Sequence, residues 1–120
     1  MATVLIVDDE PDILLMLRMS LEDEGHDVVL AADGKMALER IAERRPDIVL
    51  LDLMMPVLDG FGVLEALREQ GVERLPVVMV SAKSEPGDVE RASSLGAVEF
   101  ISKPFELDRV VALVREVLAR

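Results

Sequence analysis

Side chains that can bind a metal ion or a phosphate follow the short apolar segments of this sequence. Three carboxylates, a hydroxyl and an amine do so: Asp8, Asp9, Asp52, Ser81 and Lys103. Carboxylates suit a hard cation such as Mg²⁺, which prefers oxygen ligands. A hydroxyl and an ammonium beside that cation suit a phosphoryl group, whose negative oxygens need a metal and hydrogen-bond donors. If the fold brings these residues together, the pattern indicates phosphoryl chemistry.

Each of these residues also has a simpler interpretation when it is taken alone. Asp52 stands where Asp often starts a turn, Ser81 could cap a helix or a turn, and Lys103 could be a surface lysine. Their shared position at strand ends favours one site over five unrelated roles. Carboxylates that meet there repel one another and tend to stay protonated unless a cation neutralises them. No His or Cys is placed to make a zinc or iron site instead.

Strand and helix patterns alternate five times along the chain. The apolar runs predict strands at 4–7, 27–31, 48–51, 77–80 and 98–101, and apolar residues at helical spacing predict helices at 11–24, 33–43, 61–70, 84–95 and 107–118. This alternation predicts an α/β fold, a parallel sheet covered by helices on both faces. The commonest five-strand doubly wound order, 2-1-3-4-5, is that of flavodoxin-like folds, and it places the first and third strands side by side.

Composition limits the classes of function. The 120 residues suit one domain over 1–120, and the absence of Cys excludes disulfides and thiolate chemistry. Nothing at the N-terminus resembles a signal peptide, and no apolar run approaches the roughly 20 residues that span a bilayer, so we expect a cytoplasmic protein without membrane association. The net charge of −11 argues against direct nucleic-acid binding, and three Phe residues offer no platform for stacking bases.

Several motifs, in their order and spacing, resemble the receiver domains of two-component response regulators, such as the single-domain chemotaxis regulator. The similarity covers the whole chain. It is carried by 4–10 (VLIVDDE), Asp33-Gly34 with Ala37-Leu38, 52–56 (DLMMP) with Asp59-Gly60, Ser81-Ala82, Gly96-Ala97 and 100–105 (FISKPF). The resemblance implies a switch that accepts a phosphoryl group on Asp52 from a histidine kinase or a histidine phosphotransfer protein. It implies no enzyme activity beyond this phosphotransfer and a slow self-dephosphorylation.

The same resemblance assigns roles to individual residues. It implies that Mg²⁺ is held by Asp9, Asp52 and the backbone carbonyl of Met54, while Asp8 positions a metal-bound water. Lys103 and Ser81 would each bind a phosphoryl oxygen.

Signal output is also implied by the family pattern. Phe100 would turn inward as Ser81 moves, changing the surface formed by the fourth helix, fifth strand and fifth helix. That surface would act on a downstream protein or on an output domain outside this sequence, or support a homodimer. Whether the chain is free-standing, a relay or part of a longer regulator stays open. Charged residues on the exposed part of the fifth helix, which include Arg109, Arg115, Glu116 and Arg120, could form dimer ion pairs or a solvated face.

The sequence departs from the family pattern at a few positions. Phe100 replaces the more frequent Tyr, so packing rather than a hydroxyl must mark the switch state. Met54 cannot orient water as an amide or acid can, which predicts slower self-dephosphorylation, although Lys83 could act in the opposite direction. We expect a cis bond between Lys103 and Pro104, as in the family, and a surface position for His26.

Two other functions fit the same architecture. A flavin carrier would need a hydroxyl-rich phosphate loop after the first strand and aromatic residues beside the ring, whereas this chain has Asp8-Asp9-Glu10 there and no Trp or Tyr. A receiver-shaped interaction module would not be phosphorylated. The intact set of three Asp residues, Ser81 and Lys103 argues against that second alternative.

Overall fold

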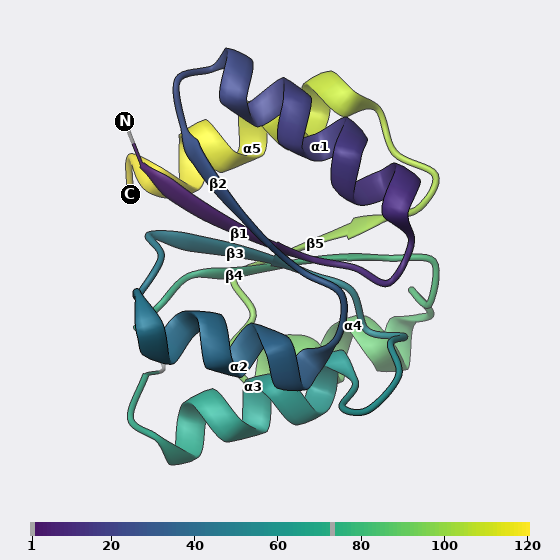
Figure 1. Ribbon diagram of the computed structural model, residues 1–120. Helices are drawn as coiled ribbons and strands as arrows, with labels where there is room; N and C mark the ends of the chain where they lie inside the picture. Colours follow the sequence, from purple (N-terminus) through teal and green to yellow (C-terminus); the bar gives the residue numbers. More distant parts are fainter. Residues whose placement is uncertain (1, 73) are drawn as a thin grey trace.

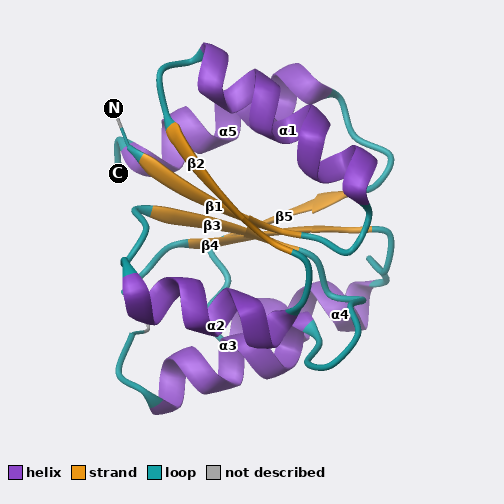
Figure 2. Ribbon diagram, in the orientation of Figure 1, coloured by secondary structure: helices purple, strands orange, loops and turns teal. Residues whose placement is uncertain are grey.

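The computed structural model describes residues 2–72 and 74–120, in which five strands and five helices alternate (Figures 1 and 2). The strands are β1 (Thr3–Val7), β2 (Asp27–Ala31), β3 (Ile48–Leu51), β4 (Val77–Ser81) and β5 (Glu99–Ser102). The helices are α1 (Pro11–Asp23), α2 (Gly34–Glu43), α3 (Gly60–Glu69), α4 (Pro86–Ser94) and α5 (Leu107–Leu118). All strand pairs are parallel and the order is β2-β1-β3-β4-β5, which confirms the predicted topology.

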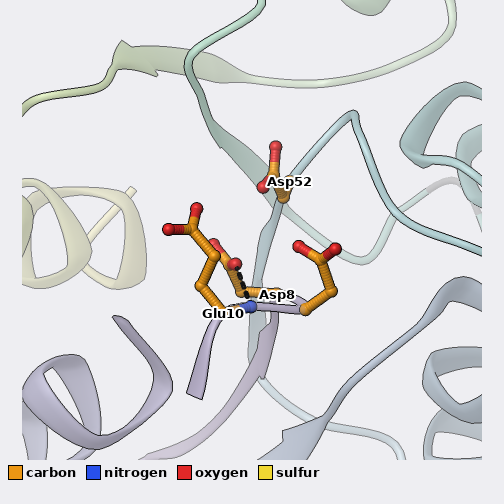
Figure 3. A group of neighbouring side chains, drawn as sticks. Asp8, Glu10 and Asp52 are labelled. Atoms are coloured by element: carbon orange, nitrogen blue, oxygen red, sulfur yellow. Dashed lines mark hydrogen bonds between the residues drawn. The ribbon is translucent and has the colours of Figure 1, made fainter. Parts of the chain in front are cut away.

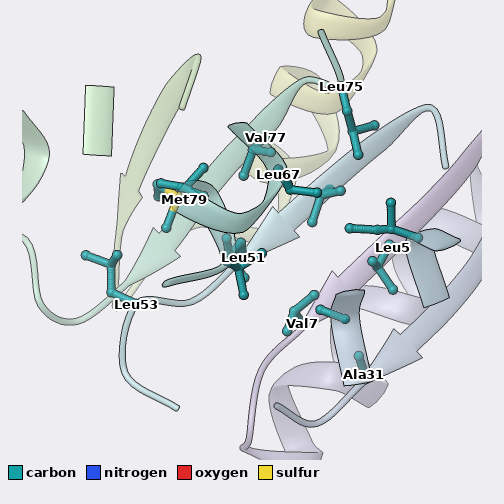
Figure 4. Close-up of a cluster of buried hydrophobic side chains, with 14 of the residues drawn as sticks. Leu5, Val7, Ala31, Leu51, Leu53, Leu67, Leu75, Val77 and Met79 are labelled. Atoms are coloured by element: carbon teal, nitrogen blue, oxygen red, sulfur yellow. The ribbon is translucent and has the colours of Figure 1, made fainter. Parts of the chain in front are cut away.

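Helices cover both faces of the sheet. α1 and α5 lie on one face, and α2, α3 and α4 lie on the other (Figure 1). Successive strand side chains point to opposite faces, so the sheet contributes to two cores. Leu5 and Val7 belong to the core beneath α2, α3 and α4, part of which Figure 4 shows. Val4 and Ile6 belong to the core beneath α1 and α5. The central strands are therefore apolar throughout, as expected for a doubly covered parallel sheet.

The register of the sheet determines which polar residues become neighbours. Val7 of β1 pairs with Leu51 of β3, so the residues that follow them, Asp8 and Asp52, leave the sheet side by side. At the other side of β3, Ser81 of β4 pairs with Ser102 of β5, the residue before Lys103. Because parallel strands end at one edge, the side chains that follow the apolar runs meet there.

Local sequence signals fix where the helices begin. Pro11 occupies the first turn of α1, where its missing N–H costs nothing. Asp33 caps α2 by accepting a hydrogen bond from the Met36 N–H at 2.8 Å, and Asp59 caps α3 in the same way through Gly62 at 2.8 Å. These caps agree with the predicted helix starts to within one residue.

Some predicted element bounds needed correction. The fourth helix, predicted over 84–95, runs from Pro86 to Ser94. β5 begins and ends one residue later than predicted, because backbone bonds to β4 define its ends: the Lys103 N–H donates to the Ser81 carbonyl at 3.0 Å. His26, for which a surface position was predicted, is half-buried, and its Nδ1 has no hydrogen-bond partner among residues 2–72 and 74–120. It lines an open pocket of about 680 Å³ at the amino-terminal ends of the strands, away from the predicted chemistry.

Candidate functional site

Two buried carboxylates, those of Asp8 and Asp52, form the centre of the predicted site. Asp8 is 2% exposed and Asp52 is 4% exposed. Each continues the backbone hydrogen bonding of its strand by one residue, since the Asp8 N–H donates to the Ala31 carbonyl at 3.1 Å and the Asp52 N–H donates to the Val7 carbonyl at 3.1 Å. The sheet therefore holds both backbones rigidly at its edge.

A close approach between β3 and α3 positions Asp52 further. The Gly60 N–H donates to the Leu53 carbonyl at 2.9 Å. A Cβ atom at Gly60 would lie 2.4 Å from the Asp52 carbonyl oxygen and 2.8 Å from the Leu53 Cα. Only glycine lets the start of α3 pack this closely against the backbone of Asp52 and Leu53.

Lys103 connects the two carboxylates. Its Nζ donates to Asp8 Oδ2 at 2.7 Å, to Asp52 Oδ2 at 3.0 Å and to Glu10 Oε1 at 3.0 Å. The lysine side chain is only 10% exposed, so the first two pairs lie largely out of water. The Lys103–Pro104 peptide bond is cis, which confirms the prediction. Lysine and both acids thus form one hydrogen-bonded unit.

Two groups of this unit, Asp8 and Lys103, have shifted pKa values. Burial raises the pKa of Asp8 above its ordinary value, and the hydrogen bond from Lys103 opposes that rise only in part. Burial alone would lower the pKa of Lys103, but its hydrogen bonds to Asp8, Asp52 and Glu10 outweigh burial and raise it. Lys103 is therefore a permanent cation at this place.

Four carboxylates at this edge could hold a cation. Asp8, Asp9, Glu10 and Asp52 each offer an oxygen, and these atoms lie within 4.8 Å of one another. Figure 3 shows the carboxylates of Asp8, Glu10 and Asp52 gathered at the strand ends. An all-oxygen donor set of this charge fits Mg²⁺, which takes one or two carboxylates and completes its shell with other oxygens. The exposed Asp9 leaves the group open to solvent.

The remaining predicted residues surround this unit in different ways. The Met54 N–H donates to Asp52 Oδ1 at 3.3 Å, while its side chain is 61% exposed. Ser81 is fully buried at the end of β4, and its Oγ accepts a hydrogen bond from the Lys83 N–H at 3.1 Å. Phe100 is half-buried on β5 and packs against the α2–α4 side of the core.

Sequence reasoning missed the position of Glu10. The prediction treated it as part of the acidic loop, whereas its carboxylate binds Lys103 across 93 positions of sequence. The signal that could have found it is its place directly after Asp8 and Asp9, at the start of a helix whose first turn faces the same edge. A long, 60% exposed side chain nevertheless has many orientations, and only the tertiary partner selects one.

Comparison with known proteins agrees with this geometry. Residues 4–115 match the model of the response regulator receiver domain. The chain belongs to the response regulator receiver family. The match covers most of the chain, so the receiver-domain resemblance and the fold predicted from it are confirmed, as is a part in two-component signalling.

This receiver domain is similar in sequence to longer regulators over only part of their length. It is 40% identical over 117 residues to the alkaline phosphatase synthesis transcriptional regulatory protein PhoP of Bacillus subtilis, covering 98% of this chain and 48% of PhoP. It is 42% identical over 118 residues to the DNA-binding response regulator MtrA of Mycolicibacterium smegmatis, covering 98% of this chain and 50% of MtrA. The chain thus spans about half the length of these relatives.

Among solved structures, the receiver domain of the Francisella response regulator 1452 superimposes with a TM-score of 0.94 at 32% identity, covering 100% of this chain and 98% of that one. The Vibrio cholerae chemotaxis protein CheY4 gives a TM-score of 0.91 at 33% identity, with 98% of both chains covered. Within the described part of this receiver domain, no helix has the length and apolar character needed to cross a membrane.

Proposed function

We propose that Asp52 is the residue of this receiver domain that is phosphorylated, and that a histidine kinase or histidine phosphotransfer protein supplies the phosphoryl group. One observation carries this proposal: Lys103 binds both Asp8 and Asp52 within a group of four carboxylates. A buried nucleophilic carboxylate, a fixed cation and a set of oxygen ligands are the parts that phosphoryl transfer to an acid requires.

The transfer follows from these positions. An oxygen of Asp52 attacks the phosphorus of a phosphohistidine, the phosphorus–nitrogen bond breaks, and its electron pair returns to the imidazole, which exchanges a proton with solvent. The new phosphorus–oxygen bond makes an aspartyl phosphate. Lys103 donates to the transferred oxygens because it already lies 3.0 Å from Asp52 Oδ2. The Ser81 hydroxyl is the proposed second donor once it releases the Lys83 N–H.

Asp9, Asp52 and the Met54 carbonyl would hold Mg²⁺, with Asp8 acting through a bound water. When bound there, the ion supplies positive charge for the phosphoryl oxygens during transfer. Backbone hydrogen bonds to neighbouring strands hold Asp8 and Asp52 in place, so the chain contributes a largely preformed site.

Output is proposed to pass through Ser81 and Phe100 to the face formed by α4, β5 and α5. Phe100 borders a pocket of about 300 Å³ between α4 and β5, which gives its ring room to move. Arg115 of α5 pairs with Glu24, and Arg120, which lies beyond the end of α5, pairs with Glu99 and Glu116 within the chain. Intramolecular pairing of these charges favours a downstream protein or an attached output domain over a dimer built on them.

An intact-mass experiment tests the assignment of Asp52. Incubation with acetyl phosphate and Mg²⁺ should add one phosphoryl group to the parent chain and none to Asp52→Asn. Asp23→Asn, at the exposed far end of α1, removes an equal charge away from the site and should still be phosphorylated. A parent that gains no phosphoryl group is an interaction module, and a gain that survives in Asp52→Asn places the acceptor elsewhere. Either result refutes the proposal.

A further inference from the structure

Glu10 occupies a helix cap position without capping the helix. It is the N-cap of α1, yet its side chain makes no capping hydrogen bond. Asp33 and Asp59 do bind the first turns of α2 and α3. The Glu10 carboxylate instead accepts a hydrogen bond from Lys103 at 3.0 Å, and its own N–H donates to Asp8 Oδ1 at 2.9 Å. Both ends of Glu10 are therefore directed at the phosphorylation site.

The ammonium of Lys103 has no donor to spare. A lysine ammonium carries three N–H donors, and Asp8, Asp52 and Glu10 accept three hydrogen bonds from it. A phosphoryl group on Asp52 adds oxygens that need a donor. Lys103 can serve them only by giving up one of its present partners.

Burial decides which partner is released. The side chains of Asp8 and Asp52 are 3% and 6% exposed, whereas that of Glu10 is 60% exposed. Freeing the Asp8 carboxylate leaves an unpaired charge out of water, which is strongly unfavourable. Phosphorylation turns the Asp52 carboxylate into an uncharged acyl group, but its carbonyl oxygen is still buried and would be left without a donor. An exposed carboxylate returns to water at little cost.

We propose that Glu10 is a displaceable counter-ion of Lys103, a positioning residue that holds the ammonium before transfer, releases it to the phosphoryl group and thereby slows phosphorylation of Asp52. This inference rests on the proposed function of Asp52. The surroundings permit the motion, since Glu10 and Lys103 line an open pocket of about 390 Å³ that also includes Ile13 and Phe105. The carboxylate of Glu10 further opposes phosphodonors, which are anions.

The test compares Glu10→Gln with the parent chain. Glutamine keeps the shape of the side chain but removes the charge, so its hold on Lys103 is weaker. Glu106→Gln is the matched control, because Glu106 is also an exposed N-cap, that of α5, without a side-chain capping bond. Initial rates of phosphorylation by acetyl phosphate are measured at saturating Mg²⁺, so that metal occupancy does not differ between variants.

We expect Glu10→Gln to be phosphorylated about two- to fivefold faster than the parent, the range expected from one partly exposed ion pair, while Glu106→Gln matches the parent. If Glu10→Gln is phosphorylated no faster than the parent, the inference about Glu10 is wrong. The proposed function still holds in that case, provided that the parent is phosphorylated on Asp52. A parent that is not phosphorylated on Asp52 overturns both.

A structure of the parent with Mg²⁺ and beryllium trifluoride, a phosphoryl analogue, supplies a second readout that does not depend on rates. Lys103 Nζ should contact the analogue and keep Asp8, with the Glu10 carboxylate more than about 4 Å away, beyond ion-pair contact. Glu10 still bound to Lys103 in that complex would refute its displacement.

Discussion

Replacing Gly60 by alanine tests whether the close contact between α3 and β3 positions Asp52. The new Cβ would start 2.4 Å from the Asp52 carbonyl oxygen and 2.8 Å from the Leu53 Cα, and real Cβ contacts essentially never fall below 3.0 Å. Both neighbours are backbone atoms, so no side chain can rotate away. The end of β3 and the start of α3 must separate by roughly half an ångström or more.

Two consequences follow for the Gly60→Ala variant. Overpacking of this kind costs about 1–3 kcal/mol of unfolding free energy. A displacement that approaches 1 Å at a reacting group lowers rates by up to about 100-fold, so we expect phosphorylation by acetyl phosphate to slow by about tenfold or more. Urea unfolding and initial phosphorylation rates measure the two effects separately.

Gly87→Ala is the matched control for this substitution. Gly87 lies in the first turn of α4, and nothing lies within 4 Å of its would-be Cβ. Alanine there should leave the phosphorylation rate unchanged and raise stability by up to about 1 kcal/mol, because alanine favours a helix. If Gly60→Ala is as stable and as fast as Gly87→Ala, the contact does not position Asp52 and our reasoning about β3 and α3 is wrong.

Three further predictions concern the charges and the loop of the site. Lys103→Met should lower the unfolding free energy by about 3–5 kcal/mol without Mg²⁺, because it leaves buried carboxylates unpaired. Lys83→Met, which breaks a more exposed pair with Asp88, should change the unfolding free energy far less. Equal losses of the two variants in urea unfolding would contradict this. Burial raises the pKa of Asp8, so the folded chain holds the proton of the Asp8 carboxyl more tightly than the unfolded chain does. The unfolding free energy should therefore fall as pH rises from 3.8 through the raised pKa. If Asp8→Asn shows the same fall in a Mg²⁺-free pH series, Asp8 is not its cause. Val57 is 74% exposed and has a φ of 71°, a backbone conformation that strains a β-branched residue but not glycine, so Val57→Gly should raise the unfolding free energy by about 1 kcal/mol. A lower melting temperature for Val57→Gly would count against backbone strain at this position.

The fold was predictable because its signals are local and agree with one another. Each strand is a short apolar run, and the helices begin at residues such as Pro11, Asp33 and Asp59 that favour helix starts. Once a parallel sheet is accepted, topology alone brings the ends of β1, β3 and β5 to one edge. That is why the contacts of Asp8 and Asp52 with Lys103 could be expected before any coordinates.

Details that depend on side-chain orientation were not predictable. The exposed side chain of Glu10 could adopt many orientations, and the hydrogen bond from Lys103 fixes one of them. His26 is half-buried because residues of α5 and of the strand starts surround it. The positive φ of Val57 contradicts the preference of β-branched residues, so no propensity could predict it. Tertiary neighbours far along the chain decide the first two, whereas the turn at Val57 is closed locally by the Leu58 N–H, which donates to the Pro56 carbonyl at 2.8 Å.

The Asp52 assignment is tested most directly by locating the phosphoryl group chemically. Borohydride reduces an aspartyl phosphate to homoserine, and peptide mass spectrometry then identifies the converted residue. After treatment with acetyl phosphate and Mg²⁺, we expect homoserine at position 52 and unmodified Asp8 and Asp9. Conversion at either of those neighbours, or at no aspartate, would contradict the role that we assign to Asp52.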